Sequence, residues 1–290
     1  LLQSGDWGDR SELVINGTLT AEAATSTNPI VFTSSAQTPA ARDWGTIRFN
    51  SGAGGSLKYC EINAASYGIY TYGNNANPTI DNCTISGNSS YGVYATYYSA
   101  PTITNSTISN NSSYGIRTRD YAVPIVTDSI ISNNSSYGIY GGWAGGITIA
   151  TSTISNNSGY GIYLDSSYKA VTITNSTITD NSGYGIYLDS SYNAVTITNS
   201  TITGNSGTGI SFYARSGSSL TVTNNIISNN SGDGLYYQNS SLIIQIKDSY
   251  FGTIDLEAIG NLITDKADDY TLGTVSVVNP VSSLIDISAD

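Results

Sequence analysis

Six residues with side chains suited to binding recur at almost fixed spacing through the middle of the chain. Each follows a glycine and a β-branched residue, and all but one are tyrosines. The six are Tyr70, Tyr94, Arg117, Tyr140, Tyr163 and Tyr187. Because a tyrosine ring is amphipathic and loses little entropy on ordering, such a series can stack against sugar rings or pack against another protomer. Ordered side chains also stabilise a sheet without any ligand, so the sequence leaves both interpretations open.

Two aspartates are the best candidates for acid–base chemistry. Asp165 and Asp189 lie one repeat apart, each within a copy of Tyr-Leu-Asp-Ser-Ser-Tyr. Carboxylates roughly 5–9 Å apart can hydrolyse glycosidic bonds. Duplication of the segment explains the pair more simply, and the sequence contains no histidine for a Ser-His-Asp or Cys-His nucleophile. We therefore assign no catalytic residue, no metal ligand and no cofactor.

The charge of the chain and its lack of long apolar runs each exclude one class of partner. Its 290 residues include 10 Lys and Arg against 21 Asp and Glu, which gives a net charge of −11. Without a basic cluster, the chain lacks the electrostatic footprint of a nucleic-acid-binding protein. No apolar run approaches the roughly 20 residues of a membrane-spanning helix, so we expect no membrane insertion in this segment.

The elements that position these side chains follow from an internal repeat of 23–25 residues. Each unit contains three short runs of alternating apolar and polar residues, separated by Asn, Ser or Gly, which is typical of short strands joined by turns. Three strands per coil, stacked in register, predict an all-β, single-stranded, right-handed parallel β-helix. Three inward columns of Ile, Val and Leu run from Leu57 to Val222, from Ile62 to Ile227 and from Ile69 to Leu235.

Asparagine marks the corners of the predicted coils. One column runs from Asn82 to Asn224, and a second runs from Asn88 to Asn230. Asparagine tolerates the left-handed backbone of turns, and stacked amides can bond to one another between coils. We therefore interpret both columns as structural.

The same Asn-Ser bias creates many Asn-x-Ser/Thr sequons, which makes the motif weak evidence for glycans. An inward asparagine cannot be modified without disrupting the coil. Asn110, Asn133 and Asn156 lie at a predicted corner and are the candidate glycosylation sites.

Glycine and threonine occupy further positions that alternation places on the surface. The glycine before each inward Ile is expected to face outward and to leave room beside the tyrosine rings. Threonine pairs such as Thr172 and Thr174 form flat arrays that resemble those of β-solenoid ice-binding proteins. Ile125 and Ala150 interrupt the array, and threonine is also the default outward residue of a polar strand.

Two cysteines occupy equivalent positions in neighbouring coils. Stacked Cα atoms about 4.8 Å apart lie inside the disulfide range of about 4.4–6.8 Å. Cys60 and Cys83 therefore form either a disulfide, which would suit an extracellular protein, or two stacked free thiols.

The repeat divides one continuous domain into three parts. Residues 1–56 are predicted to form N-terminal coils or a cap, 57–239 the regular repeats, and 240–290 irregular C-terminal coils or a cap. The tail either covers the last coil or leaves an open edge that pairs with another chain to form filaments. No signal peptide is recognisable at Leu1, and we expect a processed protein or a piece of a longer one.

The Asn-x-x-Ile-x-x-Asn-Ser-Gly-x-Gly-Ile register resembles the repeats of pectate-lyase-like proteins. The segments Gly17–Ala21, Pro29–Ser34 and Asp43–Phe49 also resemble the N-terminal coils of large bacterial surface β-helix proteins. The first resemblance implies action on polysaccharides, with clustered aspartates and a histidine, or with calcium and an arginine base. This sequence departs from those patterns because it has no histidine and no Asp-Asp pair within the repeats.

These observations predict a non-catalytic, extracellular structural or adhesive module, secreted or on the cell surface. Its expected partners are further copies of itself, in an oligomer or filament, or a surface polysaccharide bound by the tyrosine series. The alternative is a polysaccharide lyase or glycoside hydrolase, and an ice-binding solenoid is the third interpretation.

Overall fold

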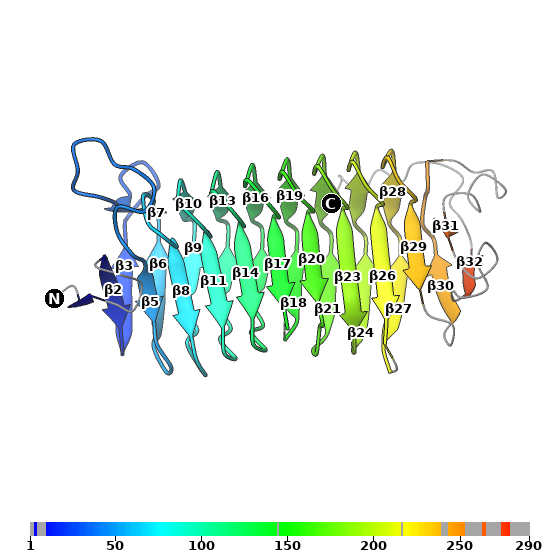
Figure 1. Ribbon diagram of the computed structural model, residues 1–290, viewed down its shortest axis with the longest axis horizontal. Coiled ribbons are helices and arrows are strands. Elements are labelled where there is room, and N and C mark those ends of the chain that lie inside the picture. Colours follow the sequence, from blue (N-terminus) through cyan, green and yellow to red (C-terminus); the bar gives the residue numbers. More distant parts are fainter. Residues whose placement is uncertain are drawn as a thin grey trace.

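The computed structural model describes residues 3–4, 10–143, 145–215, 217–238, 243–252, 263–264 and 274–278. Every secondary-structure element assigned within these residues is a β-strand, and the strands wind into the elongated rod of Figure 1. Among the described residues, sheet 1 has 12 strands, sheet 2 has 11 and sheet 3 has 9. The fold is the predicted right-handed parallel β-helix with three strands per coil.

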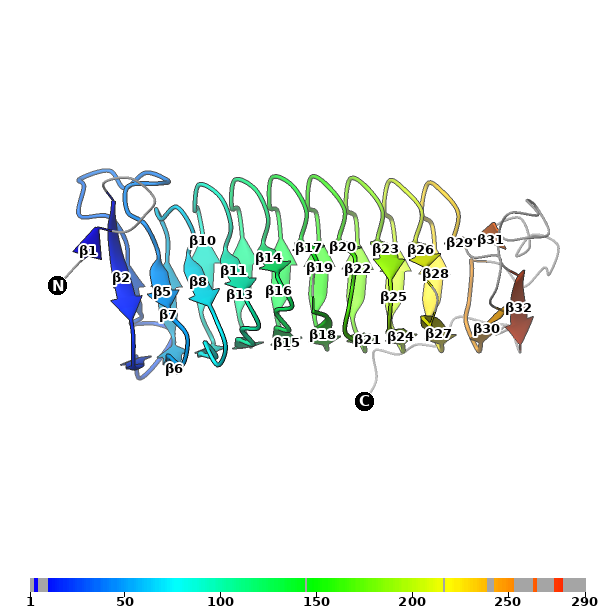
Figure 2. The same ribbon diagram turned by 60° about the horizontal axis from the view of Figure 1, so that its bottom comes forward.

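The chain visits sheets 1, 2 and 3 in turn, and each sheet runs the length of the rod (Figures 1 and 2). Sheet 1 contains β1 (Gln3–Ser4), β2 (Ser11–Ile15), β5 (Ile47–Phe49), β8 (Ile69–Tyr72), β11 (Val93–Thr96), β14 (Ile116–Arg119), β17 (Ile139–Gly142), β20 (Ile162–Asp165), β23 (Ile186–Ser191), β26 (Ile210–Ala214), β29 (Leu235–Gln238) and β31 (Ile263–Thr264). Sheet 2 contains β3 (Thr18–Glu22), β6 (Gly54–Lys58), β9 (Thr79–Asp81), β12 (Thr102–Thr104), β15 (Ile125–Thr127), β18 (Ile147–Ala150), β21 (Val171–Thr174), β24 (Ala194–Thr198), β27 (Ser219–Thr223), β30 (Ile243–Lys247) and β32 (Thr274–Val278). Sheet 3 contains β4 (Ile30–Phe32), β7 (Cys60–Ile62), β10 (Thr84–Ser86), β13 (Thr107–Ser109), β16 (Ile130–Ser132), β19 (Thr153–Ser155), β22 (Thr177–Thr179), β25 (Thr201–Thr203) and β28 (Ile226–Ser228).

Neighbouring strands pair in parallel, with equivalent residues of successive coils as partners. Ile139 pairs with Ile162 in sheet 1, for example, and Ile131 pairs with Ile154 in sheet 3. β1 differs, because it pairs with β2 in antiparallel fashion. Most of the predicted C-terminal part, 240–290, lies outside the described residues, and the predicted division into three parts stays a prediction.

The core is the stack of inward columns that the repeat predicts. Ile80, Ile103 and Ile173 are fully buried, as are their counterparts in the other two columns. A buried isoleucine stabilises the fold by about 1.5–3 kcal/mol relative to an exposed one. Because each coil contributes one such residue to every column, stacking rather than any single coil provides the core.

Sheet 1 contributes a further inward column that the sequence analysis did not identify. It follows the outward residue of each strand and is buried throughout. Its members are Thr71, Ala95, Thr118, Gly141, Leu164, Leu188, Phe212 and Tyr237. Phe49, the register partner of Thr71, is buried at the N-terminal end of the same column. The side chains are small in the middle coils and large at both ends, so their mixed types conceal the column in the sequence.

The second asparagine column forms the predicted ladder between sheets 3 and 1. Each side-chain amide donates to the amide oxygen of the next coil at 2.9–3.0 Å. The ladder consists of Asn88, Asn111, Asn134, Asn157, Asn181, Asn205 and Asn230. The first column, from Asn82 to Asn224, has left-handed backbone with φ of 46–56°, as expected for coil corners.

The repeated glycine faces inward, and the prediction that it faces outward is wrong. A Cβ at these positions would lie 2.4–2.9 Å from Cγ2 of an isoleucine in the next coil and would also meet the asparagine ladder. The glycines are Gly68, Gly92, Gly115, Gly138, Gly161, Gly185 and Gly209. The turn from sheet 3 into sheet 1 breaks simple alternation, so glycine and the following Ile both point into the rod.

Candidate functional site

The outer surface of sheet 1 carries the six residues singled out by the sequence. The structure places all six in one register column, one per coil. Pairing extends this column to Arg48 before Tyr70, and to Ser211 and Tyr236 after Tyr187. We call it the strand column. Tyr70 is buried beside its neighbours, whereas the other five predicted residues are partly exposed.

A second aromatic column lies beside the first, on the turn that enters sheet 1. Its tyrosines stack with ring centroids 4.9–5.4 Å apart and interplanar angles of 5–23°. This turn column consists of Tyr67, Tyr91, Tyr114, Tyr137, Tyr160 and Tyr184. The sequence shows these residues as the first letter of the Tyr-Gly-Ile-Tyr motif, which was the signal available to find them. The two columns together form what we call the tyrosine face.

Ring orientation determines what the tyrosine face can offer a ligand. In the turn column each ring face contacts the ring of the next coil, so ring edges rather than faces remain for a partner. The strand column changes along its length. Tyr70 and Tyr94 are stacked at 12°, whereas Tyr163 and Tyr187 meet edge to face at 78°. The later rings of the strand column therefore do not stack face to face as those of the turn column do.

Arg117 interrupts the strand column and lies among four tyrosines. Its guanidinium carbon lies 5.2–5.8 Å from the ring centroids of Tyr91, Tyr94, Tyr114 and Tyr140. Nη1 donates a hydrogen bond to the phenol oxygen of Tyr91 at 3.1 Å, while the buried Nε has no hydrogen-bond partner within the described part of the chain. Among the described residues no carboxylate pairs with Arg117. Burial by itself lowers the pKa of Arg117, but the surrounding phenols raise it above the usual value.

Arginine is concentrated in the N-terminal half of the chain. Of the six arginines in the chain, only Arg215 lies beyond residue 119. Arg48 in the strand column lies over Tyr70 and Tyr72, at 5.3 and 5.6 Å from their centroids. Arg119 on β14 is exposed and lies 3.5 Å from Asp120. Arg48 and Arg119 each lie beside a carboxylate, whereas Arg117 has no ion-pair partner among the described residues.

Asp165 and Asp189 lie at the opposite end of the same face. They are register partners on β20 and β23, and each accepts a hydrogen bond from the serine that follows it. Burial, together with these carboxylates, raises the pKa of Tyr163 and of Tyr187 to about 12 each. Neighbouring strands, and therefore register partners such as these, lie about 4.8 Å apart. The two carboxyl groups of retaining glycosidases are separated by a similar distance of about 5–5.5 Å.

A strip of exposed aromatic side chains borders the face on the turn from sheet 1 to sheet 2. Tyr98 stacks on Tyr121 at 5.2 Å, and Tyr168 stacks on Tyr192 at 5.0 Å. Trp143 is on the coil between those of Tyr121 and Tyr168, with 62% of its surface exposed, and the rings of these two tyrosines contact each other at 5.4 Å. Tyr98, Tyr121 and Trp143 have left-handed backbone, with φ of 51–66°, which is uncommon for bulky residues.

Of the two states that the sequence left open, the structure has Cys60 and Cys83 as free, buried thiols. The Cys60 thiol lies 3.2 Å from the carbonyl oxygen of Ala21, and the Cys83 thiol lies 3.4 Å from that of Leu57. The contact between the two thiols lowers the pKa of Cys60 and raises that of Cys83. Each sulfur therefore contacts a carbonyl oxygen of the preceding coil, because Ala21 is the register partner of Leu57 and Leu57 is that of Ile80.

The remaining predicted surface residues lie away from the tyrosine face. Asn110, Asn133 and Asn156 are exposed at corners with left-handed backbone, and their glycosylation stays a prediction. The threonine array lies on sheet 2, where Thr172 pairs with Thr196, and Ile125 and Ala150 interrupt its two columns. Ice binding also stays a prediction.

Comparison with known proteins identifies the family. A family model described as a right handed beta helix region matches residues 67–219, which is more than half of the chain. The chain belongs to the right-handed β-helix family. No curated protein sequence matches this β-helix.

Solved structures with similar coils act on polysaccharides according to their names. The Azotobacter vinelandii mannuronan C-5 epimerase AlgE6 A-module has a TM-score of 0.61 at 15% identity, over 93% of this β-helix and 81% of that chain. The periplasmic alginate epimerase AlgG has a TM-score of 0.58 at 16% identity, over 93% of this β-helix and 67% of that chain. The pectate lyase Pel9A has a TM-score of 0.55 at 18% identity, over 88% of this β-helix and 68% of that chain. At these identities the likeness establishes the fold alone.

Two further findings concern only the described part of this β-helix. There, no helix is long and apolar enough to cross a bilayer. Over the same residues, no group of three or more His, Cys, Asp or Glu side chains is placed to hold a metal ion.

Proposed function

We propose that this β-helix is a non-catalytic module of a secreted or cell-surface protein, and that it binds a polysaccharide along the tyrosine face. The observation that carries the proposal is Arg117, a half-buried cation held among four tyrosines without a carboxylate partner in the described residues. A purely structural column would not need a charge at this position, because tyrosine occupies it in the coils before and after. A polar or anionic ligand would give the guanidinium a partner.

The repeat of the tyrosine face suits a polymer. Equivalent rings recur at about 5 Å, as in the 5.0 Å between Tyr70 and Tyr94 and the 5.0 Å between Tyr163 and Tyr187. A chain of sugars lying along the rod would meet a similar set of hydroxyls and ring edges at each coil. Aromatic and arginine side chains are also those that dominate binding energy at interfaces.

The names of the structural neighbours support the same ligand class. The three solved structures are called an alginate epimerase, a mannuronan epimerase and a pectate lyase. Because one fold supports many functions, this support extends to the class of ligand and not to the reaction.

The test is binding of the purified chain to a panel of pectate, alginate and a neutral β-glucan, measured by affinity electrophoresis and calorimetry. We expect at least one polymer to bind, and binding to weaken at least tenfold in the double variant Tyr163→Ala plus Tyr187→Ala. The matched control is Thr172→Ala plus Thr196→Ala, which changes outward residues of the same two coils on sheet 2. Equal loss in both double variants, or no binding by the wild-type chain, would contradict the proposal.

The same preparations test self-assembly, the other expected partner. Electron microscopy and sedimentation would reveal filaments or oligomers. If the tyrosine substitutions dissolve such assemblies while no polysaccharide binds, the tyrosine face is an interface between copies and our proposal is wrong.

Glycoside hydrolysis is the second candidate, and the register pair Asp165 and Asp189 beside Tyr163 favours it. Release of reducing sugar or of unsaturated product from the polymer panel would support an enzyme. If Asp165→Asn or Asp189→Asn abolishes that release while binding persists, the pair is catalytic and the module is not merely adhesive.

A further inference from the structure

A pocket of about 280 Å³ lies at the N-terminal end of the tyrosine face. Four successive coils contribute to its lining, from the start of β2 to the turn before β11. The lining residues are Arg10, Glu12, Arg42, Gly45, Ser66, Tyr67, Ser89 and Ser90. Tyr67 is the first ring of the turn column, so the pocket is continuous with the tyrosine face.

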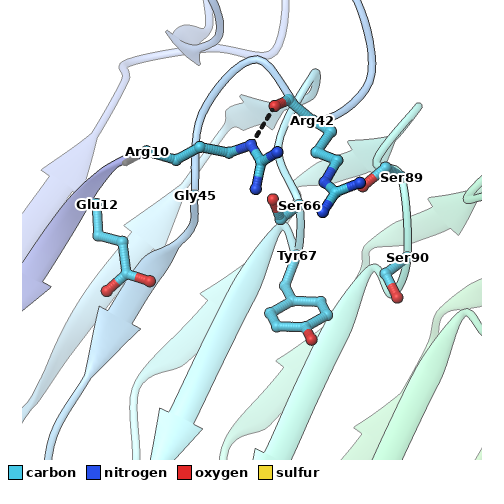
Figure 3. Close-up of a pocket in the computed structure, with 8 residues that line it drawn as sticks. All are labelled: Arg10, Glu12, Arg42, Gly45, Ser66, Tyr67, Ser89 and Ser90. Atoms are coloured by element: carbon cyan, nitrogen blue, oxygen red, sulfur yellow. Dashed lines mark hydrogen bonds between the residues drawn. The ribbon is translucent and has the colours of Figure 1, made fainter. Parts of the chain in front are cut away.

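Two arginines from distant parts of the sequence meet above Tyr67. Figure 3 shows the guanidinium groups of Arg10 and Arg42 beside the hydroxyls of Ser66 and Ser89. Arg10 Nε donates to the carbonyl oxygen of Arg42 at 2.9 Å, which ties the two segments together. Within the part of the chain that the structure describes, the Arg42 side chain has no carboxylate within ion-pair distance.

The backbone holds Arg42 in place. Arg42 has a left-handed φ of 78°, a conformation that arginine seldom adopts. Its N–H donates to Ala65 O at 3.1 Å and that of Asp43 donates to Ala64 O at 3.0 Å, so the loop after β4 is fixed to the coil that carries Ser66. The side chain is therefore presented by an ordered turn rather than by a free loop tip.

The charge of the pocket favours an anion. Among its described lining residues Glu12 is the acid, and its Oε2 lies 3.9 Å from Arg48, a third arginine. The pocket and its immediate surroundings therefore hold three guanidinium groups and one carboxylate among the described residues, and that carboxylate lies beside Arg48. In Figure 3 the Glu12 side chain points away from the two lining guanidinium groups. Planar forks of N–H donors with nearby hydroxyls match the geometry of a carboxylate.

We propose that this pocket binds the carboxylate of an acidic sugar at one end of a glycan lying along the tyrosine face. This inference rests on the proposed function for the rest of the glycan, but the pocket itself can be tested with a single sugar. The chemical class of ligand is a uronic acid, and the polymer is correspondingly an acidic rather than a neutral polysaccharide.

The experiment follows the arginine Nε–H signals of the ¹⁵N-labelled chain, of which there are only six to assign. Sodium galacturonate is titrated in one arm, and glucose, sodium chloride and inorganic phosphate in the others. We expect galacturonate to produce saturable shifts of the Arg10 and Arg42 signals, with no saturable shift from glucose or chloride. Tighter binding of phosphate than of galacturonate would contradict the assignment to a sugar acid.

Variants at position 42 complete the test. Arg42→Asn removes the charge with a residue that tolerates left-handed backbone, and Arg42→Lys retains a charge without the fork. We expect Arg42→Asn to weaken the binding of galacturonate and of a galacturonate hexamer at least tenfold. We expect Arg42→Lys to weaken the binding of both ligands less. The matched control is Lys169→Asn, an exposed cation on a distant turn, with no change expected. Melting temperatures of the variants show whether each one folds.

Failure of the two proposals is distinguishable. If the hexamer binds wild type and Arg42→Asn equally, or galacturonate leaves Arg42 unshifted, the pocket is not the acid site even though the tyrosine face binds. If no polymer binds but galacturonate shifts Arg10 and Arg42, the pocket stands and the proposed function fails.

Discussion

Arg117 on β14 donates a hydrogen bond to the phenol oxygen of Tyr91, 3.1 Å away on the preceding coil. The bond links the two columns of the tyrosine face at the one predicted position of the strand column where tyrosine is replaced. A cation over an aromatic ring contributes about 0.5–2 kcal/mol, so Arg117 stabilises the face apart from the ligand contact that we propose for it. Substitution at this residue can separate the two effects.

Arg117→Tyr should restore an unbroken tyrosine column. We expect its free energy of unfolding to stay within about 1 kcal/mol of wild type, because aromatic pairs of about 0.5–1.5 kcal/mol replace the cation contacts. Arg117→Ala should lower the free energy of unfolding by about 1–3 kcal/mol, because it removes the cation contacts and supplies no aromatic ring in their place. Urea denaturation measures stability, and both variants should bind polysaccharide more weakly. Full binding by Arg117→Tyr would show that the charge is not used by the ligand.

Asn157→Ala should break the asparagine ladder. The amide of Asn157 accepts from the backbone N and from Nδ2 of Asn134, and donates to Asn181 Oδ1 and Ile131 O. Buried groups without partners cost about 1–3 kcal/mol each, so we expect a loss of about 3–5 kcal/mol in urea denaturation. The control is Asn156→Gly, an exposed left-handed residue next to it, which should change stability by less than about 0.5 kcal/mol. Equal effects at both positions would contradict the ladder.

Gly138→Ala should destabilise the coil by crowding. The new Cβ would lie 2.7 Å from Gly161 O and 2.8 Å from Asn157 Nδ2, and overpacking of this kind costs about 1–3 kcal/mol. Gly87→Asn is the control, because Gly87 has open space around it and left-handed φ, and Asn110 fills the equivalent place in the next coil. Thermal unfolding compares them. A neutral Gly138→Ala would mean that the glycine is not required by close packing.

The tyrosine face should make stability fall at high pH. Burial raises the pKa of Tyr163 and of Tyr187 to about 12 each, above about 10 for an unfolded tyrosine. The stability from keeping these phenols neutral is fully present below pH 10, approximately, and is lost as the pH rises toward 12. Absorbance titration should show these phenols ionising above the usual pH range of tyrosine, and Asp165→Asn plus Asp189→Asn should lower both pKa values. Unchanged titration in that double variant would exclude the carboxylates as a cause.

Cys60 and Cys83 should titrate as two thiols per chain. Both are at most 2% exposed, so we expect no reaction with a thiol reagent in the folded protein and two equivalents after unfolding without reductant. A value of zero after unfolding would establish the disulfide instead.

Much of this molecule follows from the sequence alone. The 23–25-residue period and the isoleucine columns were sufficient to predict the coils, because side chains at equivalent positions must stack when strands pair in register. The ladder beginning at Asn88 followed from the same logic, as did the surface column through Tyr70 and Tyr163. These are local patterns that recur in many coils, and their recurrence makes them recognisable in the sequence.

Tertiary structure decided what depends on turns and on contacts between distant segments. The backbone at the corner before sheet 1 turned Gly138 inward and Tyr137 outward, against simple alternation, and so created the second tyrosine column. The pocket formed because one loop carries Arg42 back to Arg10 and Ser66, residues that share no repeat position. A period specifies which residues stack along the rod, but the path of each turn specifies which residues from different coils face one another across it.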